Sequence, residues 1–352
     1  MEKKVYLVGG AVRDKLLNIK ITDKDYVAVG YKESDFQHLK KVGKNFPVFL
    51  MEDGNELALA RVDNKTSLGY NGFEVSTKNV TIKEDLARRD LTINSIAYDE
   101  KNNLYIDPYN GKSDIKNKIL RHTTNAFVED PLRVLRVARF RAKLGKDWNI
   151  DKDTKFLIKN MKNELKYLQE DRIYKEIKKV LELKSSYLFF QTLFELDVLN
   201  IIFPTIYKYK ENIKILKLIA NSSDLVKLAV IYENIEIDKD IIDIKIPTKL
   251  KNNMLFIINN YEKLDNLNIL KIDDIIDFFK SLKKNIILLK EMIYFCKLKN
   301  IKIDENKILT IFKEISNYSP FKWINSQKEK PSNDDIKNHI YKENKDIIKR
   351  YL

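Results

Sequence analysis

The chain has 352 residues, 44% of them hydrophobic, which is enough to bury a sizeable core and suggests two or more domains. Its 65 basic residues against 51 acidic ones give a net charge of +14, which favours a polyanionic partner, although a solvated basic surface gives the same totals. A single cysteine excludes an intramolecular disulfide, and no apolar run approaches the ~20 residues of a membrane helix. With no signal peptide visible, we expect a cytoplasmic protein without a membrane partner.

The first predicted site lies near the start of the chain, where an apolar strand runs into a tight turn. Gly9 and Gly10 form that turn and Arg13 follows three residues later. The backbone N–H groups of the two glycines can approach a polyphosphate because no Cβ is in the way. Asp23 and Asp25 alternate along the next predicted strand and should point to the same face. Two such carboxylates repel each other unless a cation lies between them, and hard oxygen ligands suit Mg²⁺.

Residues 57–73 come next and have the pattern of a hairpin loop. A predicted strand ends near Arg61, Gly69 and Gly72 bracket a turn, and a further strand begins at Phe73.

Residues 84–97 have the pattern of an amphipathic helix that begins with acidic residues in its first turn. Arg88 and Arg89 are followed by Asp90 and, one helical turn later, by Asn94. These side chains would offer cationic and hydrogen-bonding groups from one element. An ordinary surface helix with i,i+4 polar pairs explains the same pattern equally well.

A further predicted helix covers residues 129–139. Asp130 is a natural N-cap and Pro131 a natural first helical residue. Its leucines and alanine would face one way and Arg133, Arg136 and Arg139 another. A capped helix with a solvated basic face is the alternative interpretation.

The remainder of the chain is predicted to be helical. All nine glycines lie at or before Gly145, so tight turns belong to the first part, and apolar residues recur at helical spacing from about residue 150. The predicted helix boundaries are Pro204, Pro247, Pro320 and Pro331.

In this order, four of these segments resemble the signature of the polymerase-β-type nucleotidyltransferases. The closer resemblance is to the class II branch, which contains bacterial CCA-adding tRNA nucleotidyltransferases and poly(A) polymerases. It rests on the Gly-Gly turn, the Asp23/Asp25 pair, the run Arg88-Arg89-Asp90 with Asn94, and the run Glu129-Asp130-Pro131-Leu132-Arg133, and it fades after Pro204.

The resemblance implies a fold and a set of site residues. The fold is an α+β nucleotidyltransferase head with a small mixed sheet at residues 1–140, a helical neck at 141–205 and a helical body and tail at 206–352. Asp23 and Asp25 would bind Mg²⁺ and, with Arg61, form the catalytic set. The implied nucleotide-binding residues are Gly9, Gly10, Arg13, Arg89, Asp90, Asn94, Asp130, Arg133, Arg136 and Arg139.

By the same resemblance, Asp130 and Arg133 act as a protein template for the incoming base. A carboxylate accepts from an exocyclic amino group and a guanidinium donates to the adjacent ring nitrogen. Cytosine and adenine present that pattern, whereas uracil and guanine present a carbonyl beside an N–H. The wrong base leaves buried polar groups unpaired, at about 1–3 kcal/mol each.

The implied function is the addition of C, C and A to the 3′ end of tRNA from CTP and ATP, with the lysine-rich helices binding the acceptor arm and elbow. A poly(A) polymerase of the same branch is the nearest alternative, which the lack of a long basic extension before Val5 disfavours. A non-catalytic RNA-binding protein on the same fold is a third alternative.

In the family, the loop at residues 57–73 helps to switch specificity from C to A. The three histidines, His38, His122 and His339, form no His-Asp doublet, so we expect no phosphohydrolase activity.

Overall fold

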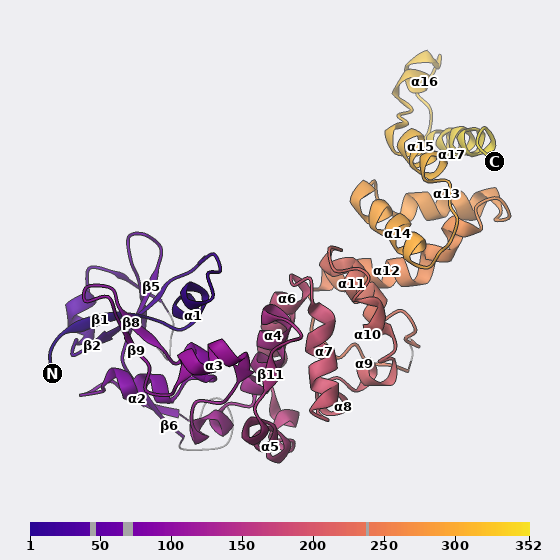
Figure 1. The fold of residues 1–352 in the computed structure, drawn as a ribbon. Coiled ribbons are helices and arrows are strands. Elements are labelled where there is room, and N and C mark those ends of the chain that lie inside the picture. Colours follow the sequence, from indigo (N-terminus) through magenta and orange to yellow (C-terminus); the bar gives the residue numbers. More distant parts are fainter. Residues whose placement is uncertain (43–46, 66–72, 237–238) are drawn as a thin grey trace. The chain divides into compact units, whose positions relative to one another are not determined.

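The computed structural model describes residues 1–42, 47–65, 73–236 and 239–352, and it divides into two units (Figure 1). The first unit comprises residues 1–221 and 235–245, and the second comprises residues 222–234 and 246–352. Among the described residues, no helix has the length and apolar character that crossing a membrane requires. The domain ranges 1–140, 141–205 and 206–352 stay predictions.

A mixed sheet forms the N-terminal part of the first unit, as predicted. Within the described residues its seven strands lie in the order β3-β4-β5-β2-β1-β8-β9, with β2 and β5 parallel and the other neighbours antiparallel. The strands are β1 (Lys4–Val8), β2 (Asp25–Val29), β3 (Lys40–Val42), β4 (Val48–Leu50), β5 (Glu56–Leu59), β8 (Ala97–Asp99) and β9 (Leu104–Ile106). Two further pairs are β6 (Val62–Lys65) with β7 (Phe73–Ser76) and β10 (Ile119–Leu120) with β11 (Asn149–Ile150).

The alternation of side chains along β2 decides where Asp25 points. Val27 and Val29 belong to one core cluster, which also contains Leu86, whereas Ala28 belongs to the cluster on the other face. Because side chains alternate with a period of two, Asp25 projects from the same face as Val27. That face is the one covered by Leu86 of helix α2 (Ile82–Ala87).

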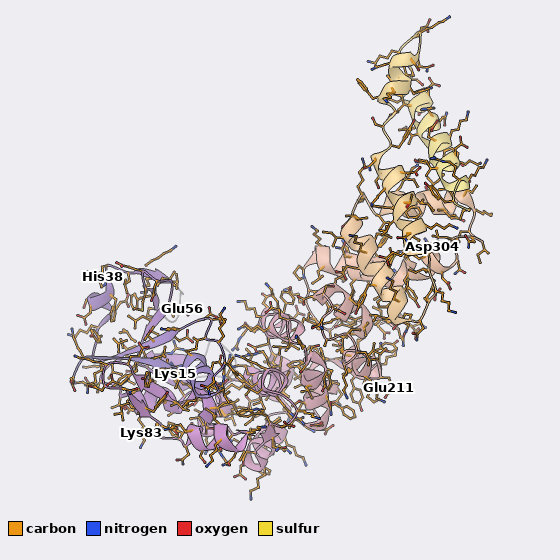
Figure 2. The ribbon with its side chains drawn as sticks, turned by 45° about the horizontal axis from the view of Figure 1, so that its top comes forward. Lys15, His38, Glu56, Lys83, Glu211 and Asp304 are labelled. Carbon is orange, nitrogen blue, oxygen red and sulfur yellow. The ribbon has the colours of Figure 1, made fainter. Side chains whose placement is uncertain are left out.

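Helices make up the rest of the first unit. The long α4 packs against α6 and α7, all three from the segment after the sheet. The described helices are α1 (Gly10–Leu16), α2, α3 (Gly111–Asn117), α4 (Leu132–Leu144), α5 (Lys152–Asn160), α6 (Glu170–Leu181), α7 (Ser186–Glu195), α8 (Leu199–Ile202), α9 (Pro204–Lys208) and α10 (Asn212–Ile215), with short 3-10 helices η1 (Glu33–Phe36), η2 (Thr92–Asn94), η3 (Asn125–Glu129) and η4 (Glu164–Tyr167). Figure 2 shows their side chains, with Lys15 on α1 and Lys83 on α2 labelled.

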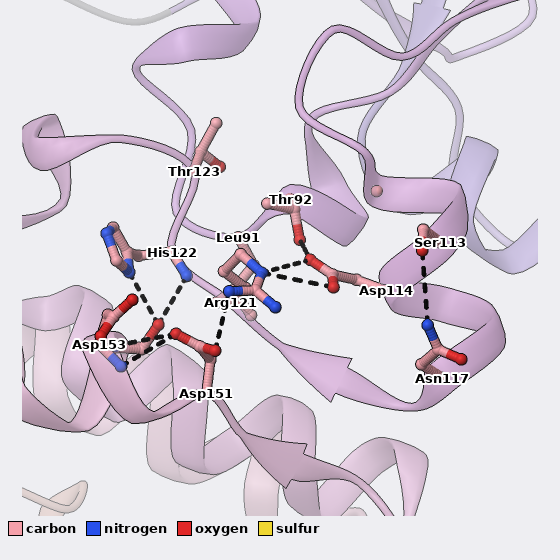
Figure 3. Close-up of polar contacts among 12 residues, drawn as sticks. Leu91, Thr92, Ser113, Asp114, Asn117, Arg121, His122, Thr123, Asp151 and Asp153 are labelled. Carbon is pink, nitrogen blue, oxygen red and sulfur yellow. Dashed lines mark hydrogen bonds and ion pairs between the residues drawn. The ribbon is translucent and has the colours of Figure 1, made fainter.

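A polar network joins η2, α3 and the start of α5 (Figure 3). Arg121 donates to Asp114 at 3.1 Å and to Asp151 at 2.8 Å, and the Thr92 hydroxyl donates to the same Asp114 carboxylate at 2.7 Å. The backbone N–H of His122 donates to the Thr154 hydroxyl at 2.9 Å. Carboxylates shared between a guanidinium and a hydroxyl in this way fix the elements that carry them.

The second unit is helical, as predicted. Its described helices are α11 (Asp224–Ile231), α12 (Thr248–Asp265), α13 (Ile272–Ser281), α14 (Ile286–Leu298), α15 (Glu305–Asn317), α16 (Phe321–Ser326) and α17 (Asn333–Lys349). The prolines mark boundaries as expected: Pro204 begins α9, Pro247 and Pro320 directly precede α12 and α16, and Pro331 lies just before α17. The side chain of Asp304 caps α15 by accepting from the Lys307 N–H at 3.0 Å (Figure 2).

The three histidines lie in separate places. His38 is exposed after η1 (Figure 2), His122 contacts Thr154, and His339 on α17 stacks on Trp323 with ring centroids 4.1 Å apart. Across the described ranges, no three His, Cys, Asp or Glu side chains gather in a way that would hold a metal ion.

Candidate active site

One cavity of about 650 Å³ in the first unit gathers the predicted site residues. All thirteen of them line it: Gly9, Gly10, Arg13, Asp23, Asp25, Arg61, Arg89, Asp90, Asn94, Asp130, Arg133, Arg136 and Arg139. They come from the turn after β1, from α1, from β2 and the residues just before it, from the link between β5 and β6, from the segment between α2 and the end of η2, and from α4 and the residues just before it. Residues more than a hundred positions apart in sequence therefore meet at one surface, although their individual roles stay predictions.

Gly9 lies where the turn, the acids and an arginine meet. Its φ of +69° is in the region that favours glycine. A Cβ added there would lie 3.0 Å from Nη1 of Arg89 and 3.9 Å from Oδ2 of Asp25. The backbone conformation therefore favours glycine here, and a Cβ would also make a tight contact with the end of the Arg89 side chain.

The surroundings of the Asp25 carboxylate disfavour its charged form. Partial burial raises its pKa, Arg89 opposes that rise, and the negative charge of Asp23 adds to it. The predicted alternation of Asp23 and Asp25 along one strand is wrong, because β2 begins at Asp25 and Asp23 lies just outside it, but Asp23 lines the same cavity. Two carboxylates at an open cavity, one of them destabilised as an anion, fit a hard divalent cation whose other ligands are water and substrate phosphates.

Buried Asp85 holds Arg89 beside the acids. Its carboxylate accepts from Arg89 at 3.1 Å, from Arg88 at 2.7 Å and from the backbone N–H of Arg61 at 3.2 Å. Burial acts to raise the pKa of Asp85, and the charges of Arg89 and Arg88 outweigh it, so the net shift is downward. The sequence pattern identified Asp85 only as an acidic first-turn residue. Its contacts with Arg88 and Arg89 are local pairs at i+3 and i+4, whereas its contact with the Arg61 N–H joins distant segments.

The lowered pKa of Asp85 predicts a contribution to stability that disappears in acid. A carboxyl group whose pKa is lower in the folded state stabilises the fold above its unfolded pKa of about 4, and this is lost as pH falls through the folded value. Each pKa unit corresponds to about 1.4 kcal/mol. We expect Asp85→Asn to be less stable at pH 7 and to lose less stability on going to pH 3 than the wild type.

Denaturant titrations followed by Trp148 fluorescence, in a Trp323→Phe background, measure this in the first unit alone, because these are the chain's two tryptophans. The exposed Asp153→Asn is the matched control. Parallel stability–pH curves for Asp85→Asn and the wild type would contradict the prediction.

Residues 84–97 do not form the single helix that the pattern predicted. Helix α2 ends at Ala87, Leu91 is extended and bridges to His122, and Thr92–Asn94 form a short 3-10 helix. Backbone pairing with the segment around His122 outweighs the local helical pattern. The expected side-chain contact survives, because Asn94 Nδ2 donates to Asp90 at 3.0 Å.

Asp90 connects the head to helix α4. Its second carboxylate oxygen accepts from Nε of Arg136 at 2.7 Å, while Arg13 donates to Asn94. Burial acts to raise the pKa of Asp90, but Arg136 and the Asn94 amide lower it strongly, so Asp90 is an anion.

The predicted template pair lies at the start of helix α4. The Asp130 carboxylate accepts from the Leu132 N–H at 3.1 Å, but the helix begins at Leu132 with Pro131 as its N-cap residue, so it begins one residue later than predicted. The Arg133 guanidinium donates to the backbone carbonyls of Ala126 and Arg88. Each member of the pair is thus fixed by its own partners at the cavity wall.

The charged side chains of α6 were expected to have a mainly structural role and were not among the predicted site residues. Arg172 makes two hydrogen bonds to Asp130, and buried Glu176 accepts from Arg139 and lies 3.8 Å from Arg136. Arg172, Glu176 and Lys179 follow one another at i, i+4 and i+7, which places them on one face of a helix. That spacing was the available signal. Besides Arg172, the cavity is lined by further residues that were not predicted: Ala11, Asp14, Thr22, Arg88, Glu129, Leu132, Phe140, Lys143 and Lys179.

Two segments of the chain match known protein families. Residues 5–121 match the family described as the poly A polymerase head domain, and residues 147–209 match the one described as a probable RNA and SrmB-binding site of polymerase A. Residues 5–121, which contain the mixed sheet and most of the cavity's glycine and acidic residues, are therefore similar to a poly A polymerase head domain.

Two relatives with about half of their residues identical to this chain over the matched part are CCA-adding enzymes. A CCA-adding enzyme of Francisella tularensis subsp. novicida is 50% identical over 210 residues, covering 58% of this chain and 56% of that protein. One of Buchnera aphidicola from Schizaphis graminum is 49% identical over 211 residues, covering 58% and 51%. This N-terminal part of the chain is similar to these CCA-adding enzymes, and the chain spans about half the length of these relatives.

Solved structures share the fold over nearly the whole chain. The CCA-adding enzyme of Bacillus stearothermophilus in complex with CTP has a TM-score of 0.72 at 19% identity, covering 99% of this chain and 89% of that one. The Thermotoga maritima CCA-adding enzyme complexed with tRNA has a TM-score of 0.64 at 22% identity, covering 99% and 87%. At this level of identity the likeness establishes the fold.

Proposed function

We propose that this protein adds C, C and A, without a nucleic-acid template, to the 3′ end of tRNA, using CTP and ATP and releasing pyrophosphate. The observation that carries the proposal is the single cavity that brings the Gly9–Gly10 turn, the Asp23/Asp25 pair and the Asp130/Arg133 pair together. The names of the relatives support the substrate assignment.

In this proposal each group of residues has a separate role. Gly9, Gly10 and Arg13 hold the triphosphate with Arg89 beside the acids. Mg²⁺ bound by Asp23 and Asp25 would supply charge neutralisation at the α-phosphate that the RNA 3′-hydroxyl attacks. The new bond joins the 3′-oxygen to that phosphorus, and the bond to pyrophosphate breaks. Arg61, on the same wall as Arg88 and Arg89, completes the proposed catalytic set.

The two arginines farther along α4 each form an ion pair with an acidic residue. Arg136 is bound to Asp90, and Arg139 is bound to Glu176. These pairs keep the guanidinium groups in place at the cavity wall, and each planar group has further N–H donors for phosphate oxygens. The proposed roles of Asp90 and Asn94 are contacts near the ribose.

The lysine-rich helices supply the second part of the proposal. They would bind the tRNA acceptor arm and elbow through phosphates and shape, which predicts steep salt dependence. We place the protein in the cytoplasm, where its substrates are found. A role in switching from C to A was predicted for the loop at residues 57–73, of which residues 66–72 lie outside the described residues.

The test is incorporation into tRNA that ends before CCA, with each nucleotide supplied alone and then in combination. We expect two C residues with CTP alone, then one A and arrest when ATP is added, and loss of both when the divalent metal is chelated. Long A tracts would indicate the poly(A) polymerase alternative. No incorporation with bound tRNA would indicate the non-catalytic RNA-binding alternative.

A further inference from the structure

A bidentate ion pair holds the predicted template carboxylate from a neighbouring helix. Nη1 of Arg172 lies 3.1 Å from Oδ1 of Asp130, and Nη2 lies 2.7 Å from Oδ2. Arg172 is on α6, whereas Asp130 precedes α4. The two side chains are 22% and 24% exposed and both line the cavity, so the pair lies at the surface that a base would contact.

The contacts of Asp130 leave it one defined acceptor position. An ionised carboxylate has about four lone-pair sites. Oδ1 accepts from the Leu132 N–H and from Arg172, and Oδ2 accepts from Arg172, among the contacts of the described residues. The remaining site is on Oδ2. Because a two-pronged guanidinium contact fixes the plane of the carboxylate, this site points in one direction.

Arg133 is held by different groups. Its guanidinium donates to the carbonyl of Ala126 in η3 and to that of Arg88 just after α2. The acceptor and the donor of the template are therefore positioned independently, the acceptor by α6 and the donor by the head. A change at Arg172 should disturb the reading of the exocyclic amino group while Arg133 keeps its own partners.

We infer that Arg172 is a specificity-determining positioning residue, which aims Oδ2 of Asp130 at the exocyclic amino group of cytosine or adenine. The inference rests on the proposed function, since it concerns base selection in that reaction. Without the bidentate contact, the carboxylate can rotate and reach water or a different edge of the base. Discrimination between an amino group and a carbonyl then falls, because the acceptor no longer opposes the carbonyl at a fixed place.

The test compares kcat/KM for CTP and UTP on tRNA that ends before CCA. Arg172→Lys keeps the positive charge but loses the planar fork, and Arg172→Gln loses both. We expect the ratio of CTP to UTP to fall at least about tenfold in each. Arg141→Lys is the matched control, because the same change on α4 affects a residue paired with Glu195 rather than one lining the cavity. That variant should keep the wild-type ratio.

A double-mutant cycle separates positioning from a merely structural role. If Arg172 acts through Asp130, then Arg172→Lys added to Asp130→Asn should lower the CTP to UTP ratio no further. Because Arg172→Lys retains the aliphatic part of the side chain and the positive charge, this variant still tests the inference if Arg172→Gln does not fold. A lower Tm with unchanged discrimination in Arg172→Lys would overturn the inference. Failure of the wild type to incorporate C or A would instead overturn the proposed function.

Discussion

Replacing Asp23 and Asp25 together by asparagine is expected to lower the rate of nucleotide incorporation at least about 10³-fold. Metal stabilisation of the charge that develops in a phosphoryl-transfer transition state contributes several kcal/mol, and each 1.36 kcal/mol corresponds to a factor of ten. The two carboxylates are the acidic pair at the glycine turn, and the raised pKa of Asp25 reflects its burial and the neighbouring charge of Asp23. Single-turnover incorporation of C into tRNA that ends before CCA measures the effect.

The double substitution is also expected to affect nucleotide binding and nucleotide incorporation differently. Removing two negative charges beside the phosphate-binding turn should leave metal-free CTP binding unchanged or tighter, because repulsion between the acids and the triphosphate is removed. Glu52→Gln, an exposed change just after β4, is the matched control and should keep the wild-type rate. Full incorporation activity in the Asp23→Asn, Asp25→Asn protein would refute the assignment of these residues.

The second large effect is expected at the template. Asp130→Asn replaces an acceptor-only group by an amide that also donates, so it can pair with the carbonyl of uracil. We expect kcat/KM for CTP to fall about 10–100-fold and UTP incorporation to rise relative to CTP, since one unmatched buried contact costs about 1–3 kcal/mol. Asp130 is the cleaner position to change, because replacing Arg133 would also leave the carbonyls of Ala126 and Arg88 without their donor.

Competition between CTP and UTP in one reaction gives the discrimination directly. Asp147→Asn is the control, because this carboxylate is 66% exposed and pairs with Lys118 rather than lining the cavity. An Asp130→Asn enzyme that prefers C over U as strongly as the wild type would mean that another group reads the base.

Local sequence patterns predicted the parts of the site that depend on short-range geometry. The alternation that places Asp25 on β2 and the positive φ that favours glycine at position 9 are local, and both can be recognised without tertiary information, but the strand does not extend back to Asp23. The boundaries marked by prolines are local for the same reason, because proline lacks the N–H that a continuing helix needs.

The parts that sequence reasoning missed depend on contacts between distant segments. The break after Ala87 follows from backbone pairing of Leu91 with His122, and the contact of Asp85 with the backbone of Arg61 also joins distant segments. The partnership of Arg172 with Asp130 spans 42 positions, so the spacing within α6 indicates a charged face but not what it contacts. Tertiary contacts of this kind outweigh local propensity.

The most direct test of the central claim is a crystal structure of the protein soaked with CTP and Mn²⁺, read by the anomalous scattering of manganese. We expect an anomalous peak within coordination distance of carboxylate oxygens of both Asp23 and Asp25, with the triphosphate against the Gly9–Gly10 turn and the cytosine amino group at Oδ2 of Asp130. A bound nucleotide whose metal contacts neither aspartate, or whose base lies away from Asp130, would contradict the account.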